Sequence, residues 1–346
     1  MKKIELVPGY WISPVIKGGW QLSSGHSLKK SISEEQAIAD IVSFITAGIS
    51  TLDFGDIYTG VEVLVGKALA QLQERDGDEA RTKIQLHTKY VPNETSLDSY
   101  DPRDAKEIVQ RSLERLGVKQ VDLVQFHWWR YEARNYLTAL EALFELKQSG
   151  AIREVGITNF DLPRLQEMVD AGLKPASIQI QYSILDRRAE SGMTDYCLEN
   201  GIGILCYGTV AGGFISERFL RQPEPTQFDT RSNIKYKLII DDFGGWELFQ
   251  ELLQCLHDLA LVHHADIATI SSAFTLSRPG VTAVIVGARN LEHLQNNLLI
   301  PTLVLRADEI AAIEGIIAKA NGPVGPVYGL ERDNERHRRI IHTNNN

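Results

Sequence analysis

Eight short runs of β-branched and other apolar residues alternate with longer amphipathic segments along this chain of 346 residues. Runs of this kind predict strands, and strands that alternate with helices predict repeated βα units around a parallel sheet. The predicted strands are 15–18, 50–53, 83–88, 121–126, 154–157, 177–181, 203–206 and 283–286. Because no change of composition divides these units, the pattern favours a (β/α)8 TIM barrel that forms a single domain over residues 1–346.

The segments between the predicted strands have helical periodicity. In 33–47, apolar residues recur every three or four positions behind Ser33, which predicts an N-cap with Gln36 three residues later, and Gly48 predicts the end of the helix. The other predicted helices are 61–73, 104–116, 136–149, 162–171, 193–200, 291–298 and 307–319. We expect these helices to cover the outside of the barrel.

Two stretches depart from this rhythm. Residues 217–245, which contain Pro223 and Pro225, are too long for an ordinary βα loop and predict an extended loop or lid. The last 26 residues, from Asn321, begin with glycines and prolines and end in polar residues. We expect the first part of this tail loop to fold over a site, and the residues from about 340 onward to be frayed or disordered.

The composition excludes several classes of function. The chain has 36 basic and 45 acidic residues and a net charge of -9, which argues against a nucleic-acid-binding surface or an anionic-membrane surface. Its three cysteines lack metal-ligand spacing, so we expect reduced core residues and no zinc or other metal site. Glu5, Pro8 and Gly9 interrupt the N-terminal apolar run, and no stretch approaches the about 20 apolar residues of a membrane span. We therefore expect a soluble cytoplasmic protein.

Four polar residues fall where predicted strands end, at the end of a barrel where catalytic groups gather. Asp53, Lys89 and His127 close or directly follow the second, third and fourth predicted strands. Tyr58 lies in the loop after the second strand. Taken singly, each has an ordinary structural explanation as a loop cap, a packing aromatic or a solvated side chain, so the argument rests on the combination.

Together, the four residue types suit proton transfer. Because the reference pKa of tyrosine is about 10, Tyr58 can act as a general acid near neutral pH only if its phenolate is stabilised. Lys89 supplies a nearby cation, and Asp53 keeps that lysine charged and oriented. His127 is placed to hydrogen-bond the substrate oxygen. The set predicts protonation of a carbonyl oxygen while hydride reaches the carbonyl carbon.

These residues and their neighbours resemble the aldo-keto reductase superfamily. The similarity rests on TLDFGDIY at 51–58, HTK at 87–89 and QFHW at 125–128, and it extends from about residue 15 to residue 305. The resemblance implies a (β/α)8 barrel and the NADPH-dependent reduction of aldehydes and ketones, or the reverse oxidation of alcohols. It also implies that the catalytic tetrad is Asp53, Tyr58, Lys89 and His127.

The resemblance further implies a site for a nicotinamide cofactor. Thr158, Asn159 and Gln181 are predicted to hydrogen-bond the nicotinamide carboxamide, and Tyr207 is predicted to stack on the nicotinamide ring. The glycine-rich run 208–216 is predicted to bring backbone N–H groups to the pyrophosphate, although it has Gly-Thr-Val where the family more often has Ser-Pro-Leu. The other predicted cofactor contacts in this part of the site are Gly19, Trp20, Asp53, Gly208, Thr209, Val210, Ala211, Gly213 and Ser216.

The segment after the last predicted strand resembles the family's adenosine-phosphate grip, whereas a strand-linked G-x-G-x-x-G of a Rossmann domain is absent. The predicted contacts are Gly287, Ala288, Arg289, His293, Asn296 and Asn297. Arg289 is predicted to pair with a 2'-phosphate. Because His293 and Asn296 replace residues that are often Gln and Glu in the family, we expect no carboxylate to repel that phosphate. The sequence therefore favours NADPH, with NADH as the alternative cofactor.

Aromatic residues near the predicted strand ends suggest a substrate pocket. Its predicted members are Trp20, Tyr58, His127 and Trp128. Trp129 is predicted either to join this wall or to pack structurally.

These residues bear on three possible functions. The favoured one is an enzyme that acts on a small-molecule carbonyl or alcohol. The alternative is an NADPH-binding regulatory or redox-sensing barrel with little turnover, which does not need Tyr58. A metal-dependent hydrolase is not supported, because His263 and His264 are adjacent on a predicted helix and point to different faces. The physiological substrate, the reaction direction and the oligomeric state stay open.

Overall fold

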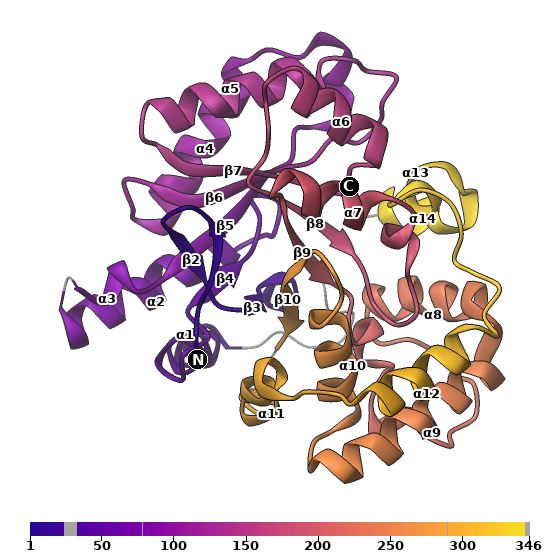
Figure 1. Ribbon diagram of the computed structural model, residues 1–346. Helices are drawn as coiled ribbons and strands as arrows, with labels where there is room; N and C mark the ends of the chain where they lie inside the picture. The colour runs from indigo at the N-terminus through magenta and orange to yellow at the C-terminus, as the bar shows by residue number, and fades with distance from the viewer. Residues whose placement is uncertain (24–32, 78, 289, 343–346) are drawn as a thin grey trace.

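Eight parallel strands form one closed barrel in the computed structural model, which describes residues 1–23, 33–77, 79–288 and 290–342 (Figure 1). The strands follow one another in chain order around the barrel, and the last pairs with the first. They are β3 (Val15–Gly18), β4 (Thr51–Asp53), β5 (Gln85–Tyr90), β6 (Val121–Phe126), β7 (Ile152–Thr158), β8 (Ser177–Gln181), β9 (Gly203–Tyr207) and β10 (Val281–Gly287). The predicted (β/α)8 barrel is confirmed, with strand ends shifted by one or two residues at most.

The strand register gathers polar side chains at one end of the barrel. Asp53 is paired in register with Gly18 on one side and with His87 on the other, and Lys89 is paired with Gln125. Because side chains alternate across a strand, residues two apart face the same way. The carboxyl ends of parallel strands meet at one edge, so Asp53 of β4, Lys89 of β5 and Gln125 of β6 come together there.

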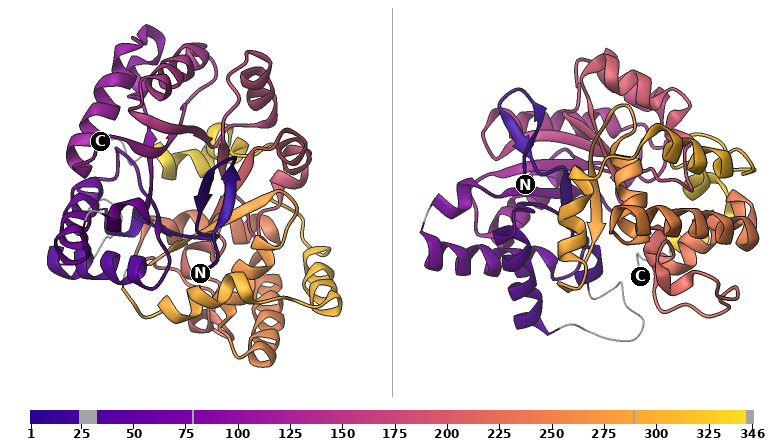
Figure 2. Two further views of the ribbon diagram at one scale, coloured as in Figure 1. Left: turned by 60° about the vertical axis from the view of Figure 1, so that its left-hand side comes forward. Right: turned by 60° about the horizontal axis from the view of Figure 1, so that its bottom comes forward.

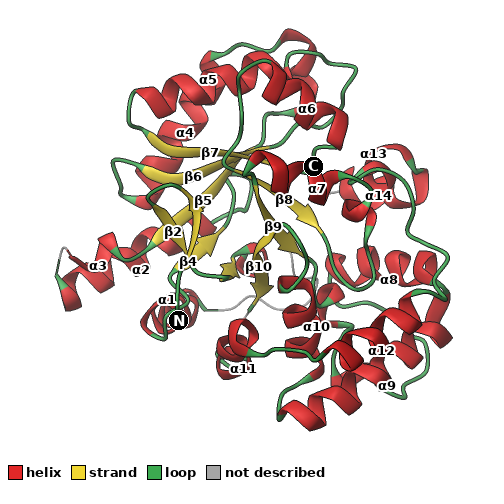
Figure 3. Cartoon of the chain, in the orientation of Figure 1, coloured by secondary structure: helices red, strands yellow, loops and turns green. Residues whose placement is uncertain are grey.

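Helices surround the strands as predicted (Figure 3). The first, α1 (Glu34–Thr46), begins behind Ser33, whose hydroxyl accepts a hydrogen bond from the Gln36 backbone N–H at 3.2 Å. This contact confirms the predicted N-cap. The other helices that match predicted segments are α2 (Val61–Asp76), α4 (Arg103–Leu116), α5 (Tyr136–Gln148), α6 (Leu162–Asp170), α7 (Met193–Asn200), α11 (Leu294–Leu299) and α12 (Ala307–Ile317), and a short α3 (Glu79–Thr82) follows α2.

The prediction of a long loop over 217–245 was wrong in its second half. Helix α8 (Arg231–Phe243) begins there behind Thr230, whose hydroxyl accepts from the Asn233 N–H at 3.1 Å. Two further helices, α9 (Gly245–His263) and α10 (Ile267–Leu276), follow it. His263 was placed on a predicted helix, but no bounds were predicted for either of them. Apolar residues of these three helices form a second buried cluster beside the barrel core, and this burial stabilises α8.

No single helix among the described residues is long and apolar enough to cross a membrane. Within the described part of the chain, α9 and α10 would reach the necessary length and apolar character together, but they meet at a bend of 92°.

The two ends of the chain lie over opposite ends of the barrel. An antiparallel hairpin of β1 (Ile4–Val7) and β2 (Tyr10–Ile12), which was not predicted, precedes the first barrel strand (Figure 2). Its residues Leu6, Tyr10 and Ile12 pack against interior barrel residues. The C-terminal tail forms α13 (Gly329–Asp333) and α14 (Glu335–His342), so it is partly helical instead of a loop. Of the predicted frayed end, 343–346 lie outside the described residues.

Candidate active site

Three of the four predicted catalytic residues meet at the carboxyl ends of the strands. The Nζ atom of Lys89 lies 2.6 Å from Oδ1 of Asp53 and donates a second hydrogen bond to the backbone oxygen of Phe54 at 2.8 Å. Both side chains of the ion pair are buried, with 6% and 5% of their surface exposed. The same Nζ lies 5.1 Å from the centroid of the Tyr58 ring. A buried cation therefore stands directly beside the phenol.

Two glutamines that the sequence analysis did not single out complete the surroundings of Asp53. Gln125 and Gln179 each donate a side-chain hydrogen bond to Oδ2 of Asp53, at 2.6 and 2.7 Å. Gln179 also donates to the side-chain oxygen of Gln125 at 2.9 Å. Both oxygens of the carboxylate are thus bonded, which fixes its orientation towards Lys89. The sequence pattern that could have identified these two glutamines is a polar side chain at an inward-facing position of a buried strand.

Burial and the neighbouring charges act in opposite directions on the pKa values of Lys89 and Tyr58. Burial lowers the pKa of Lys89, but Asp53 and Tyr58 raise it more, so the net pKa lies above its usual value and the ammonium persists. Burial raises the pKa of Tyr58, and this effect outweighs the opposite effect of Lys89. Lys89 therefore stabilises the phenolate, as a nearby cation is expected to, but the net pKa of Tyr58 still lies above its ordinary value. Tyr58 is a protonated phenol at neutral pH.

His127 is buried beside this group and uncharged. Its Nδ1 lies 3.3 Å from the backbone oxygen of Thr158. Burial, together with the charges of Arg332 and Lys89, lowers the pKa of His127 to about 3. Because a carbonyl oxygen only accepts hydrogen bonds, the neutral tautomer that fits carries its proton on Nδ1 and leaves Nε2 as an acceptor.

Aromatic rings form a wall around these groups, but not with all the predicted members. The rings of Trp20 and Tyr58 lie 5.0 Å apart, and Trp129 packs edge-on against His127 at 4.7 Å. The prediction of Trp128 as a pocket residue was wrong: Trp128 is fully buried in the core, and its Nε1 donates to a backbone carbonyl at 2.8 Å. Adjacent residues after a strand point in opposite directions, so only one of the two tryptophans can face the site.

The residues predicted to hold a nicotinamide carboxamide also lie together. The Tyr207 hydroxyl donates to Oδ1 of Asn159 at 2.8 Å, and the Thr158 hydroxyl donates to the backbone oxygen of Gln179 at 3.1 Å. The side-chain nitrogen of Gln181 donates to Asp186 at 2.6 Å, whereas its Oε1 is buried and has no hydrogen-bond partner among the described residues. An unpaired buried acceptor is costly. The N–H of a carboxamide fits this oxygen, so the donor set suits a nicotinamide.

Several members of the predicted pyrophosphate run are already occupied. The small size of Gly208 admits Tyr236 of α8, because a Cβ at Gly208 would lie 2.4 Å from the Tyr236 hydroxyl oxygen. The Thr209 hydroxyl lies 3.0 Å from that of Ser272. Three predicted backbone donors bond within the same run: the N–H groups of Ala211, Gly213 and Ser216 donate to the backbone oxygens of Gly208, Val210 and Phe214, each at 2.9 Å. These three N–H groups thus have partners inside the loop, and their contact with a pyrophosphate stays a prediction.

The predicted adenosine-phosphate grip contains a carboxylate that we did not expect. The side chain of Asn296 donates to Oδ2 of Asp266, and Nδ1 of His293 lies 3.9 Å from the same oxygen. Asp266 also caps α10 by accepting from the Thr269 N–H at 2.7 Å. The reason given for favouring NADPH, the absence of a carboxylate here, was therefore wrong.

The remaining predicted cofactor contacts take part in local packing. Gly19 donates its N–H to the Asp53 backbone oxygen at 2.7 Å. The Gln21 side chain lies against Gly287, where a Cβ would come within 2.0 Å of it. The Ala288 backbone oxygen accepts from Lys17 at 3.1 Å, and Asn297 is largely buried. Arg289 lies outside the described residues.

The C-terminal tail supplies further residues to the site. This agrees with the expectation that the first part of the tail folds over a site. The Tyr328 ring packs edge-on against His127 at 5.7 Å. Arg332 of α13 donates to the backbone oxygens of Trp128, Asn159 and Trp129 at 2.7, 3.1 and 3.3 Å. A short helix near the end of the chain thus ties together the loops that follow β6 and β7. Sequence reasoning expected this tail to fold over a site but did not single out Arg332.

Comparisons with known proteins show which family this chain resembles. Residues 14–318 match the family model described as the Aldo/keto reductase family. The NADH-specific methylglyoxal reductase of Escherichia coli (strain K12) is 26% identical over 319 residues, which cover 86% of this chain and 93% of that protein. The uncharacterized oxidoreductase YqkF of Bacillus subtilis (strain 168) is 30% identical over 273 residues, which cover 77% and 82%.

Solved structures show the same architecture. The thermostable aldo-keto reductase Tm1743, crystallised with the inhibitor epalrestat, matches with a TM-score of 0.72 at 25% identity, covering 91% of this chain and 100% of that chain. The aldo-keto reductase of Bombyx mori in complex with NADP matches with a TM-score of 0.70 at 20% identity, covering 91% and 92%. Because the family model spans most of its length, this chain belongs to the aldo/keto reductase family.

Proposed function

We propose that this protein catalyses the nicotinamide-dependent reduction of an aldehyde or ketone to an alcohol, or the reverse oxidation, with Tyr58 as the proton donor. The observation that carries the proposal is the buried ion pair of Asp53 and Lys89 beside the Tyr58 ring. Burying two charges costs free energy that a structural role alone repays poorly. A fixed cation beside a phenol has a direct use in proton transfer.

Each residue of the site has a separate task in this reaction. When bound, a reduced nicotinamide supplies the hydride that reaches the carbonyl carbon. Tyr58 gives its hydroxyl proton to the carbonyl oxygen, where negative charge develops, and Lys89 stabilises the phenolate that remains. Asp53 keeps Lys89 charged and oriented through the contact of 2.6 Å. The neutral His127 offers Nε2 to the hydroxyl group of the alcohol and so fixes its position.

Different residues are proposed to bind the nicotinamide end and the adenosine end of the cofactor. Gln181, Asn159 and Tyr207 hold the nicotinamide end, and the unpaired Oε1 of Gln181 supports this assignment. NADPH remains the proposed cofactor because of Arg289. The carboxylate of Asp266 opposes a 2'-phosphate in the same region and so lets NADH compete. The E. coli relative is named NADH-specific.

The test is the loss of reduced-cofactor absorbance with a panel of aliphatic, aromatic, sugar and dicarbonyl substrates. The panel includes methylglyoxal, which the name of the E. coli relative specifies, and each substrate is run with NADPH and with NADH. Oxidation of either cofactor that depends on a carbonyl substrate supports the proposal. Tight binding without turnover in either reaction direction would favour the regulatory barrel, and no cofactor binding would overturn the site assignment.

A further inference from the structure

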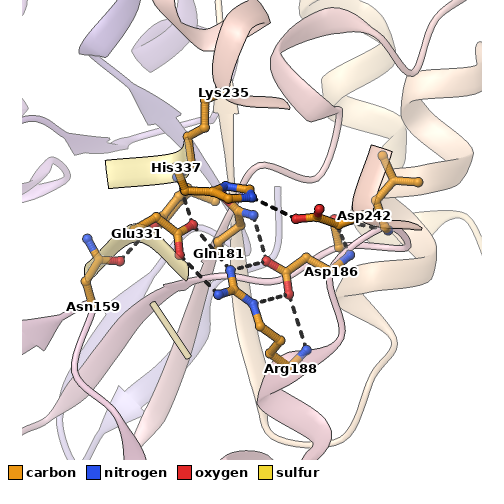
Figure 4. Close-up of polar contacts among 11 residues, drawn as sticks. Asn159, Gln181, Asp186, Arg188, Lys235, Asp242, Glu331 and His337 are labelled. Carbon is orange, nitrogen blue, oxygen red and sulfur yellow. Dashed lines mark hydrogen bonds and ion pairs between the residues drawn. The ribbon is translucent and has the colours of Figure 1, made fainter. Parts of the chain in front are cut away.

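A cluster of buried charged side chains lies next to the mouth of the barrel and joins three segments that are distant in sequence (Figure 4). Asp186 and Arg188 come from the loop after β8, Lys235 from α8 and Glu331 from α13. Glu331 and Arg188 are 1% and 4% exposed. The reaction proposed above assigns no task to any of these residues.

The contacts in this cluster form one continuous chain that ends at Gln181. Arg188 holds both oxygens of Glu331, at 3.1 and 3.2 Å, and both oxygens of Asp186, at 2.9 and 2.7 Å. Oδ2 of Asp186 in turn accepts the side-chain N–H of Gln181 at 2.6 Å. Two-point contacts between a guanidinium and a carboxylate are geometrically specific. The position of Glu331 therefore limits how Asp186 can be oriented.

The charges of the cluster balance only when Glu331 is present. Arg188 and Lys235 are the two cations, and Asp186 and Glu331 are the two anions, with Lys235 Nζ at 3.6 Å from Glu331. The two cations lower the pKa of Glu331 to about 2 in spite of its burial, which acts in the opposite direction. Loss of this carboxylate would leave two buried cations facing one anion, and Asp186 would then have to serve both.

The orientation of the Gln181 amide depends on this chain. A glutamine amide has a donor end and an acceptor end of nearly the same shape, so only its partners decide which end points where. Asp186, a pure acceptor when ionised, binds the nitrogen and so turns Oε1 to the opposite side, where it has no partner among the described residues. If Asp186 moved, the amide could present its N–H group in that direction instead.

We propose that Glu331 is a positioning residue of the cofactor site: through Arg188 and Asp186 it holds the acceptor oxygen of Gln181 towards the N–H of the nicotinamide carboxamide. The C-terminal helix α13 is then part of the cofactor site as well as a cover over His127. This inference rests on the proposed nicotinamide-dependent function.

The test compares Glu331→Gln with Glu335→Gln, a substitution of the same kind at an exposed position nearby whose side chain is 79% exposed. Binding of NADPH and of its 3-acetylpyridine analogue, in which a methyl group replaces the carboxamide nitrogen, is followed by tryptophan fluorescence. We expect Glu331→Gln to weaken NADPH binding about tenfold, which corresponds to about 1.4 kcal/mol. The analogue should lose less than about twofold, because it never donates to Gln181, and Glu335→Gln should change neither affinity.

A purely structural role of Glu331 predicts a different result. It would weaken NADPH and the analogue equally, and that outcome, like an unchanged NADPH affinity, would overturn the proposal. The conservative variant Arg188→Lys keeps the charge but loses the two-point contacts, so we expect the same selective loss as for Glu331→Gln.

Gln181→Met supplies a variant that leaves all four charged residues of the cluster in place. It should abolish the preference for NADPH over the analogue, and adding Glu331→Gln to it should cause no further selective loss. If Gln181→Met leaves the preference unchanged in an active enzyme, the inference fails while the proposed function stands. If the wild-type protein turns over no carbonyl with either cofactor, the proposed function itself fails.

Discussion

The buried pair of Asp53 and Lys89 allows a stability prediction that can be tested without a substrate. In Asp53→Asn, the Lys89 ammonium stays in a site that is only 6% exposed and loses the carboxylate that lies 2.6 Å away. In Lys89→Met, Asp53 keeps its hydrogen bonds from Gln125 and Gln179 but loses its cation. Each single change therefore leaves one buried charge without its partner.

The expected magnitude follows from this burial. Removing one member of a buried ion pair costs about 3–5 kcal/mol, whereas replacing both members with uncharged groups of similar volume costs much less. We therefore expect each single variant to lose about 3–5 kcal/mol of unfolding free energy. The double variant Asp53→Asn/Lys89→Met should lose no more than the more stable of the two single variants.

Urea unfolding followed by tryptophan fluorescence measures these values, provided that the denaturant slopes of the four proteins agree. The matched control is Glu34→Gln, which breaks a pair with Lys67 of the same length, 2.6 Å, but with side chains 57% and 48% exposed. That change should cost at most about 1 kcal/mol. If the losses of the two buried single variants simply add in the double variant, Asp53 and Lys89 are not a coupled pair and the reasoning is refuted.

Further predictions concern three residues of the site. The pKa of His127 lies at about 3, whereas an ordinary histidine has a pKa of 6.5. The pH profile of carbonyl reduction should therefore show no inflection near pH 6.5. An inflection near pH 6.5 that disappears in His127→Gln would contradict this prediction. Because the folded-state pKa of His127 is lowered, the folded protein is most stable above pH 6.5 and loses this stability as the pH falls towards 3. We therefore expect acid to lower the Tm of His127→Gln less than the Tm of the wild type. Asp266→Asn, which preserves an N-cap residue type, should raise kcat/KM with NADPH relative to NADH about fivefold by removing a repulsion; an unchanged ratio would remove Asp266 from the cofactor site. Trp129→Ala should raise KM for aromatic aldehydes roughly tenfold with little change in cofactor affinity, and equal losses in both would indicate general damage.

The barrel could be predicted from sequence because its strands carry their signal locally. Runs such as Val121–Phe126 are short, apolar and bounded by turn residues, and their order along the chain is also their order in the barrel. Helix α8 was missed although Tyr236, Ile239, Ile240 and Phe243 have helical spacing. Prolines and polar residues precede this helix. Its apolar face packs into the second buried cluster, and the sequence alone did not reveal that cluster.

The catalytic residues could be predicted from the sequence for the same reason, since Asp53, Lys89 and His127 each close or directly follow a predicted strand. The supporting residues could not. The roles of Gln125 and Gln179 depend on which way the strands face, and Arg188 meets Glu331 across 143 positions of sequence. The carboxylate of Asp266 reaches Asn296 from the start of another helix. Such contacts are set by packing and leave no local pattern in the chain.

The substitution Tyr58→Phe tests the central claim most directly, because it removes one hydroxyl group and leaves the ring beside Trp20 and Lys89 in place. Turnover with the best carbonyl substrate and cofactor affinity are measured on the same preparation. The proposed mechanism predicts that turnover falls by about 100- to 10,000-fold while cofactor affinity changes less than about twofold. A Tyr58→Phe enzyme that reduces carbonyls at the wild-type rate would contradict the assignment of Tyr58 as the proton donor.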